Sequence, residues 1–326
     1  MTRLLVPLCL GMVCLSSAWA QEKSPANKSQ QAVVDATQAD ADFALQGEYL
    51  GPATASSNQG LQLVALGEGK FQGILYGKGL PGETWDGKTR LAITGETIGG
   101  KVQLSGTNFR GTVDGGELKA DLDGVVFTLK KINRQSPTLG AKPPLGALIL
   151  FDGNNVDSWD NGKLVEGNLL GVGTRTKQKF KDYTLHLEFR TPYMPHARGQ
   201  GRGNSGLYLN DQYEFQILDS FGLSGENNEC GGYYSFAKPK LNMCLPPLTW
   251  QTYDVDFTMA KYDANKTKIK PATATIRLNG VIVHDKYEIP KFNGGGGQAD
   301  ESLPGSIYLQ DHGNPVHFRN IWILER

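Results

Sequence analysis

The sequence predicts an all-β protein of two domains, and three observations lead to this prediction. The 326 residues exceed one ordinary domain, and 39% hydrophobic with 20% charged residues is the composition of a globular protein with a substantial core. Short runs of alternating polar and apolar residues fill most of the chain, whereas no segment has the 3.6-residue period of a helix. The 41 glycines lie between these runs, as turn residues between strands would.

The charge balance argues against polyanionic partners. Lysine plus arginine and aspartate plus glutamate both total 33, so no net field is available to hold nucleic acid or an anionic membrane surface. After residue 20 no apolar run is long enough to cross a bilayer. We therefore expect a neutral partner, with no nucleic acid and no membrane span.

The first twenty residues have the features of a secretory signal peptide. Arg3 supplies the positive charge, residues 4–15 form the apolar stretch, and residues 18–20 (Ala-Trp-Ala) form a small-x-small cleavage site. A lipoprotein anchored through Cys14 is less favoured, because Val13 stands where a small residue normally precedes the lipidated cysteine. We expect residues 1–20 to be removed and the protein to be secreted or periplasmic.

The N-terminal half of the mature chain predicts one small β-domain. Residues 21–42 are polar and alanine-rich without strand alternation, which predicts a disordered leader. In residues 43–134, Asp-Gly pairs between the runs offer the positive φ of tight hairpin turns, so we expect a small antiparallel barrel or sandwich. The expected strands of this domain are 61–66, 70–77, 90–96, 101–106, 109–113, 117–122 and 125–132.

Residues 135–147 form a proline-containing linker to a second β-domain. Proline fixes φ and cannot donate to a sheet, so this segment separates the two sets of strands. Residues 148–326 predict a two-sheet sandwich or jelly roll, with longer strands that are richer in aromatic residues. The expected strands are 183–190, 205–210, 213–220, 252–260, 273–280, 306–312 and 316–325.

Residues 82–89 (GETWDGKT) match the nucleotide-binding expression GxxxxGK[ST], but we reject that interpretation. A phosphate-binding loop leads into a helix whose N-terminal amides face the phosphates, whereas residues 90–96 alternate like a strand. Trp85 also crowds a loop that should be lean. The sequence predicts a hairpin loop here, with no nucleotide partner.

Polar residues alternate with apolar ones in several strands of the second domain, and alternate side chains share a face. A solvated sheet also has a polar face, so solvation is the competing interpretation. The residue types favour a ligand, because short or fork-shaped donors and acceptors hold sugar hydroxyls, and aromatic rings pack on pyranose faces unless they belong to the core. The candidates for a concave binding face are His186, Glu188, Arg190, Asn204, Glu214, Gln216, Asp219, Gln310, His312 and Arg319, with Trp159, Tyr208, Tyr233, Tyr234 and Trp250 as possible aromatic contacts.

Two further features concern chemistry. Residues 214–219 resemble the ExDxxE strand of laminarinase-type glycosidases, but the central aspartate is replaced by Gln216, and a retaining glycosidase needs two carboxylates about 5 Å apart. Cys230 and Cys244 are the only cysteines after residue 20, and in an oxidising compartment such a pair predicts a disulfide that closes a loop near the site.

Seven blocks, in order, resemble the 3-keto-disaccharide hydrolase domain family. They are LFDG at 150–153 with Trp159, LEFR at 187–190, GNSGLYL at 203–209, YEFQILD at 213–219, WQTYDV at 250–255, LNG at 278–280, and SIYLQDHG from 306 with FRNI ending at Ile321. The resemblance implies a concanavalin A-like jelly roll that acts on glycosides oxidised at C3. The preceding small β-domain and linker are similar to an arrangement in exported proteins of planctomycete-type bacteria.

For such a substrate the C3 ketone acidifies the hydrogen on C2, so that a base can remove it, the C1 substituent leaves by β-elimination, and water adds back. The enzyme needs a base, donors to the enolate and an acid for the leaving oxygen. We expect Glu214 or His312 as the base, although His312 could equally close a turn. The other expected sugar contacts are Gln310, Asn204, Gln216, Asp219, Tyr208 and Trp159, with Arg190 or Arg319 beside the enolate.

Several alternatives stay open at this point. A buried ion pair of Arg319 with Glu188 or Asp311 is favoured over a ligand contact. A divalent metal on Glu214, Asp219 and His312 is conceivable, but the spacing fits no metal motif and we expect no cofactor. The function classes are a 3-keto-glycoside lyase or hydrolase, a conventional glycosidase, and a non-catalytic carbohydrate-binding module.

Overall fold

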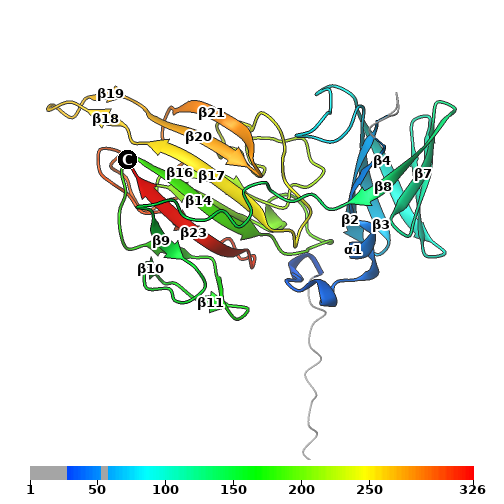
Figure 1. Ribbon diagram of the computed structural model, residues 1–326, viewed down its shortest axis with the longest axis horizontal. Coiled ribbons are helices and arrows are strands. Elements are labelled where there is room, and N and C mark those ends of the chain that lie inside the picture. Colours follow the sequence, from blue (N-terminus) through cyan, green and yellow to red (C-terminus); the bar gives the residue numbers. More distant parts are fainter. Residues whose placement is uncertain (1–27, 53–57) are drawn as a thin grey trace, which may run out of the picture.

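The computed structural model describes residues 28–52 and 58–326, and it confirms the all-β prediction. A closed barrel lies at one end of the molecule and a sandwich of two large sheets at the other (Figure 1). The predicted signal peptide, Cys14 and the first part of the predicted leader lie outside the described residues. A search of the described residues for a helix long and apolar enough to span a bilayer finds none.

Residues 28–42 are folded, which corrects the prediction of a disordered leader for this part. The backbone of Val33 pairs with that of Tyr193, and Tyr193 Oη donates to Asp40 Oδ1 at 2.7 Å. Composition alone could not reveal contacts with a residue so distant in the chain. The elements of this segment are two short 3-10 turns and one short helix, η1 (Lys28–Gln30), η2 (Ala36–Gln38) and α1 (Ala41–Leu45).

Eight antiparallel strands in chain order form the barrel, which closes because β1 pairs with both β2 and β8. The residues that alternate inward, such as Leu63, Val102 and Leu129, are fully buried. Asp123 and Gly124 have positive φ in the last hairpin turn, as the turn chemistry predicted. The strands are β1 (Gly47–Leu50), β2 (Gly60–Gly67), β3 (Lys70–Tyr76), β4 (Arg90–Ile98), β5 (Lys101–Gly106), β6 (Phe109–Asp114), β7 (Glu117–Leu122) and β8 (Val125–Ile132).

The segment that matches the nucleotide-binding expression lies in the loop between β3 and β4. Asp86 organises this loop, since its Oδ1 accepts from the amides of Lys88 and Thr89, both at 2.9 Å. The loop then enters strand β4 rather than a helix. It therefore lacks the helix N-terminus on which phosphate binding by such a loop depends.

The sandwich consists of a five-stranded and an eight-stranded sheet whose apolar faces meet in one core. Tyr253 Oη donates across this core to the carbonyl of Gln216 at 2.6 Å. The five-stranded sheet, in spatial order, contains β10 (Trp159–Asp160), β13 (Thr174–Thr176), β22 (Tyr308–Leu309), β15 (Ser205–Leu209) and β16 (Tyr213–Ile217). The other contains β11 (Leu164–Val165), β12 (Leu169–Leu170), β23 (His317–Glu325), β14 (Tyr183–Arg190), β17 (Gln251–Thr258), β20 (Ala272–Leu278) and β21 (Val281–Ile289), with β9 (Leu148–Phe151) paired to β23. A separate ribbon of β18 (Lys261–Tyr262) and β19 (Lys268–Lys270) projects from the end farthest from the barrel (Figure 1).

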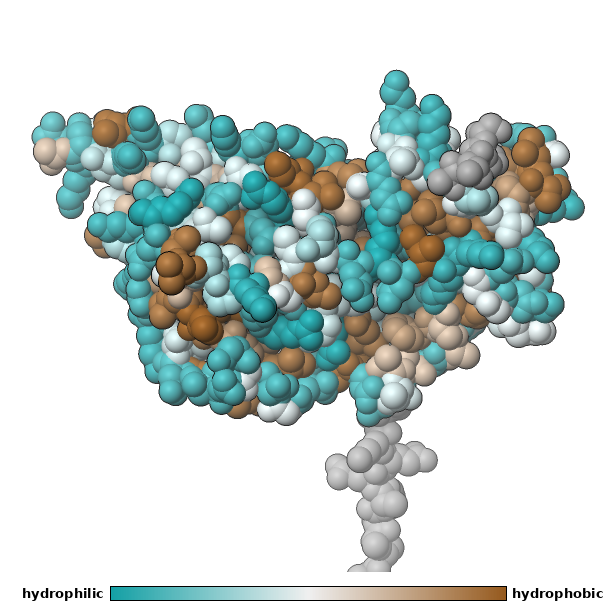
Figure 2. All heavy atoms as spheres, viewed as in Figure 1, coloured by the Kyte–Doolittle hydropathy of each residue, from teal (hydrophilic) through white to brown (hydrophobic). Residues whose placement is uncertain are grey.

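The two domains are joined by packing as well as by the chain. Val64 and Leu66 of β2 pack into the sandwich core, while Tyr193 of the sandwich packs into the barrel core. Arg90 Nη2 donates to the carbonyl of Gly222 across the same junction at 3.0 Å. Figure 2 shows the two bodies in direct contact, with hydrophilic residues over much of the visible surface.

The linker of residues 135–147 runs along the outer face of the eight-stranded sheet (Figure 1). Thr138 Oγ1 donates to Asp254 Oδ2 and the amide of Gly140 donates to Glu188 Oε1, both at 2.6 Å. Trp322 Nε1 donates to the carbonyl of Ala141 at 3.1 Å. The linker is therefore fixed to the sheet over several residues.

Candidate functional site

A pocket of about 280 Å³ opens on the five-stranded sheet and gathers polar side chains from separate segments. Six of the predicted residues line it, namely Asn204, Tyr208, Glu214, Gln216, Gln310 and His312. Sequence reasoning missed Gln200, Asn293, Gly294 and Gly295, and it named Tyr234 only as an aromatic candidate. The volume is slightly below the roughly 300–1,000 Å³ typical of small-molecule sites, which suits one sugar ring.

The hairpin of β15 and β16 places the central groups. Tyr208 lies directly opposite Glu214 in the ladder, and Gly206 lies opposite Gln216. A Cβ at Gly206 would approach Glu214 Oε1 to 2.6 Å, and one at Gly295 would approach Tyr208 Oη to 2.0 Å. Glycine at these two positions leaves the space that the acid and the phenol occupy.

Glu214 is the titratable centre of the pocket. Its side chain is buried, its Oε2 accepts from Tyr208 Oη at 2.7 Å, and it forms no ion pair within the described part of the chain. Burial raises the pKa of Glu214 to about 7, although the bond from Tyr208 acts in the opposite direction. Burial and the neighbouring glutamate raise the pKa of Tyr208 far above its ordinary value, so the phenol remains a donor.

Side-chain amides surround this pair. Gln310 Nε2 donates to Tyr208 Oη at 3.3 Å, and Gln310 Oε1 is a buried acceptor without a partner in the structure. The amide of Gln216 contacts Gln200 Oε1 at 2.8 Å and Asn204 Oδ1 at 3.3 Å, and exchange of its oxygen and nitrogen lets it donate to Glu214 Oε1 instead. Such groups can donate to and accept from several hydroxyl or carbonyl oxygens of one sugar.

Two residues shape the mouth of the pocket. His312 is exposed there, at the end of the segment that follows β22. Asn293 accepts from the amide of Glu214 at 2.7 Å and donates to the carbonyl of Tyr234 at 2.6 Å, so it fixes the start of the glycine run at residues 294–297. Asn293 was missed because it lies outside every alternating strand, where parity gives no signal.

A family model described as the 3-keto-alpha-glucoside-1,2-lyase-like domain matches residues 146–324, more than half of the chain. The chain belongs to this family. A crystal structure of a candidate glycosyl hydrolase from Parabacteroides distasonis ATCC 8503 is 30% identical with a TM-score of 0.50, over 56% of this chain and 85% of that one. A second such structure from the same organism is 18% identical with a TM-score of 0.40, over 56% of this chain and 94% of that one. No curated protein matches.

The matched region is the sandwich, so the C-terminal part of the chain is a carbohydrate-active, glycosyl-hydrolase-like domain at the level of the family. The pocket lies entirely within this lyase-like domain. The resemblance of the two-domain arrangement to planctomycete-type proteins stays a prediction, because the match does not include the barrel.

Asp219 and Trp159 do not reach the pocket of the lyase-like domain, which corrects two predicted sugar contacts. Asp219 is buried and its Oδ2 accepts from Arg202 Nε at 2.6 Å. It follows the end of β16, where strand alternation no longer fixes the direction of a side chain. Trp159 is a core residue whose Nε1 donates to the carbonyl of Leu150 at 2.8 Å, the role left open for each aromatic.

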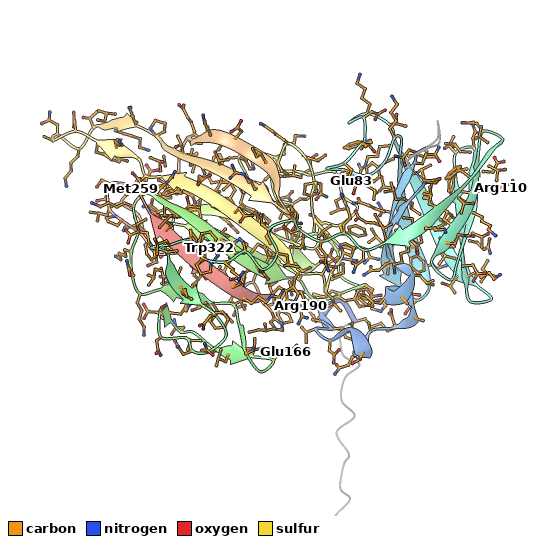
Figure 3. All side chains as sticks on the ribbon, in the orientation of Figure 1. Glu83, Arg110, Glu166, Arg190, Met259 and Trp322 are labelled. Carbon is orange, nitrogen blue, oxygen red and sulfur yellow. The ribbon has the colours of Figure 1, made fainter. Side chains whose placement is uncertain are left out.

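Arg190 and Arg319 lie on the other sheet, so neither lines the pocket. Arg319 Nε donates to Glu188 Oε2 at 2.6 Å, the ion pair that the sequence favoured. Arg190 lies 3.5 Å from Glu166 (Figure 3), and both guanidinium groups face the ring of Trp250, at 5.0 Å for Arg190 and 4.0 Å for Arg319. Alternation correctly separated these side chains from the core but could not assign them to a sheet.

Cys230 and Cys244 are free and buried in the structure, which corrects the predicted disulfide. The two thiols are nonetheless neighbours, since each affects the pKa of the other. Cys244 Sγ also donates to the carbonyls of Leu218 and Leu245, both at 3.4 Å. The pair therefore packs in the core as thiols. The sequence correctly indicated that the two cysteines lie close together, but not that they are unbonded.

The metal site considered for Glu214, Asp219 and His312 does not assemble, because Asp219 turns to Arg202. Across residues 28–52 and 58–326 no group of three or more His, Cys, Asp or Glu is arranged to hold a metal ion.

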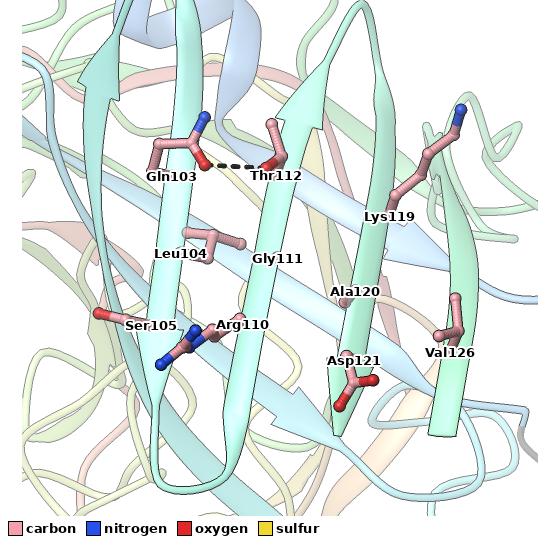
Figure 4. A pocket seen from close by; sticks show the side chains of 10 residues that line it. All are labelled: Gln103, Leu104, Ser105, Arg110, Gly111, Thr112, Lys119, Ala120, Asp121 and Val126. Carbon is pink, nitrogen blue, oxygen red and sulfur yellow. Dashed lines mark hydrogen bonds between the residues drawn. The ribbon is translucent and has the colours of Figure 1, made fainter. Parts of the chain in front are cut away.

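The barrel carries a wider hollow of about 470 Å³ over β5 to β8 (Figure 4). Gln103 and Thr112 hydrogen bond across it at 2.8 Å, and its charged residues, Arg110, Lys119 and Asp121, all reach solvent. This hollow has the side chains of a solvated strand surface and no buried acid, so it lacks the features that distinguish the pocket around Glu214.

Proposed function

We propose that the pocket binds a glucoside oxidised at C3 and cleaves it by elimination, with Glu214 as the base. The observation that carries this proposal is a single buried carboxyl whose pKa is raised to about 7, surrounded by neutral amides and a phenol. A base with a pKa near the working pH is the most effective in proton transfer. The family, whose name refers to a 3-keto-alpha-glucoside lyase, supports this substrate class.

In the proposed first step the Glu214 carboxylate takes the proton from C2, and the electron pair forms the C2–C3 double bond of an enolate. Gln310 Nε2, which has a second hydrogen beyond its bond to Tyr208, and Tyr208 Oη, which Glu214 no longer needs as a donor once it is protonated, stabilise the negative oxygen on C3. The enolate then re-forms the ketone while the C1–oxygen bond breaks and a C1–C2 double bond forms. His312 or water at the open mouth gives the departing oxygen its proton, and addition of water across C1 and C2 completes hydrolysis.

The pocket gives less support to a conventional retaining glycosidase. That mechanism needs two carboxylates about 5–5.5 Å apart, whereas Glu214 is the one carboxylate among the described residues that line the pocket. The second acid that the laminarinase comparison offered, Asp219, is paired with Arg202 instead. A binding module without turnover remains the other class to test.

Matched substrates separate these functions. The purified protein is given a nitrophenyl 3-keto-α-glucoside and the parent nitrophenyl α-glucoside, and nitrophenol release is followed. Release from the 3-keto compound alone supports elimination, release from both supports a glycosidase, and binding without release supports a binding module.

A second measurement tests the enolate. A 3-keto sugar that has hydrogen in place of the C1 substituent has no aglycone to lose, so in D₂O the protein should exchange its C2 hydrogen for deuterium without releasing a product, as followed by NMR. Exchange that persists at the wild-type rate in Glu214→Gln would refute the assignment of Glu214 as the base.

Export of the protein, expected from residues 1–20, is likewise a proposal and is tested by N-terminal sequencing of the protein recovered outside the cytoplasm.

A further inference from the structure

The loop between β14 and β15, residues 191–204, touches the pocket at one end and the barrel along its middle. We call it the clamp loop. Gln200 and Asn204 of this loop line the pocket. Its Tyr193 is buried in the barrel core, so the loop leaves the sandwich before it returns to the site.

The barrel contacts the clamp loop through the end of β2. Arg198 Nη2 donates to the carbonyl of Leu66 at 3.0 Å, and Arg202 Nη1 donates to the carbonyl of Ala65 at 3.3 Å. His196 packs so closely on Gly67 that a Cβ there would lie 2.3 Å from the imidazole ring. Three successive barrel residues therefore hold three residues of one loop.

Arg202 connects this contact to the pocket. It is buried, and its Nε donates to Asp219 Oδ2 at 2.6 Å while its own carbonyl accepts from the amide of Asp219 at 3.1 Å. Asn204 follows two positions later, and its Nδ2 donates to the carbonyl of Gln200 at 2.8 Å. A displacement of Arg202 would therefore be expected to move Gln200 and Asn204, the two amides of the clamp loop that line the pocket.

We propose that the barrel is a positioning domain for the active site, and that Arg202 is the positioning residue through which it places Gln200 and Asn204. None of the described residues of the barrel lines the pocket, and the barrel lies outside the region that the family model matches. Its contribution is instead a pair of backbone carbonyls at a fixed place. The substrate used to test this inference rests on the proposed function, but the inference about loop position does not.

The test compares Arg202→Lys with Arg90→Lys. Lysine at 202 keeps a positive charge for Asp219 but loses the guanidinium that also reaches Ala65. Arg90→Lys is the matched control, because it removes another arginine bond across the same junction, to Gly222, without touching the clamp loop. For the 3-keto substrate we expect Arg202→Lys to raise KM about tenfold and Arg90→Lys to change it less than about twofold, with similar kcat.

Hydrogen exchange of the unliganded protein gives a readout that needs no substrate. Amides of residues 199–205 should exchange faster in Arg202→Lys than in the wild type or in Arg90→Lys. If exchange and KM are the same in both variants, the barrel does not position the loop and the inference is overturned. If the loop loosens but the wild type cleaves no 3-keto glucoside, the proposed function fails while the positioning role stands.

Discussion

Replacement of Glu214 by glutamine should abolish activity and stabilise the fold at the same time. Glutamine keeps the shape of the side chain and an oxygen that can accept from Tyr208, but it cannot take a proton from C2. Loss of a general base typically lowers turnover by about 10²–10⁴-fold. We expect kcat/KM on the 3-keto glucoside to fall by that order, measured by nitrophenol release.

The stability change follows from the raised pKa. Folding raises the pKa of Glu214 from the ordinary 4.5 to about 7, so the folded protein binds a proton that the unfolded chain releases between these values. The wild type therefore loses stability as pH rises from about 4.5 to 7, by up to about 3 kcal/mol, since one pH unit corresponds to roughly 1.4 kcal/mol. Glu214→Gln carries no such charge, so its excess stability should appear above pH 7 and vanish near pH 4.

Urea unfolding at pH 4 and pH 9 measures this difference, and Glu301→Gln is a suitable control. Glu301 also accepts from tyrosine hydroxyls, at 2.8 Å from Tyr213 and 3.1 Å from Tyr262, but it lies outside the pocket and pairs with Lys268. Its replacement should reduce stability and leave kcat unchanged. If Glu214→Gln keeps wild-type turnover, or is less stable than the wild type at pH 9, the account of Glu214 as a buried, destabilising catalytic base is wrong.

Three further predictions concern Glu188, His312 and Trp159. Burial opposes ionisation of Glu188, but hydrogen bonds from His186, Asn320, the Gly140 amide and Arg319 lower its pKa to about 2. The ionised Glu188 therefore stabilises the fold above about pH 4.5, and this stabilisation is lost as the pH falls toward 2. Glu188→Gln should therefore cost about 3 kcal/mol at pH 7 in urea unfolding and much less near pH 2. His312→Ala should lower kcat by about tenfold or more with an unchanged Tm, because this exposed side chain makes no packing contribution. Trp159→Phe should lower the unfolding free energy by about 1–2 kcal/mol through the lost bond to Leu150, with KM unchanged.

Strand periodicity was sufficient to predict the architecture but not all of its strands. The runs of the barrel agree with β2 to β8 because each combines alternation with a glycine-containing turn. Strand β1 is only four residues long, Gly47–Leu50, and its partner β2 lies beyond residues 53–57, so no local hairpin signal marked it. Strand β21 was missed because several of its residues reach solvent and the polar run at its centre breaks the alternation.

The candidate site was predictable where strands carry it and not elsewhere. Glu214 and Gln216 on one strand, with Gln310 and His312 at the end of another, met in space because β22 and β16 both pair with β15. Gln200 and Asn293 lie on loops, whose course depends on contacts with distant segments. No local pattern in the sequence encodes the approach of Gln200 to Gln216.

The expected placement of Arg190 beside the ligand shows what parity leaves undetermined, whereas the ion pair with Glu188 that the sequence favoured for Arg319 is present. A sandwich has two outer faces, and alternation only states that a side chain is turned away from the core shared by both sheets. On the eight-stranded sheet, the linker covers part of that face through Thr138 and Gly140, and Glu188 neutralises Arg319. On the five-stranded sheet no segment of the described residues crosses the pocket in this way, and burial raises the pKa of its Glu214 to about 7. Similar polar residues thus form an ion-pair network, covered in part by residues 135–147, on one face and line an open pocket, the proposed active site, on the other.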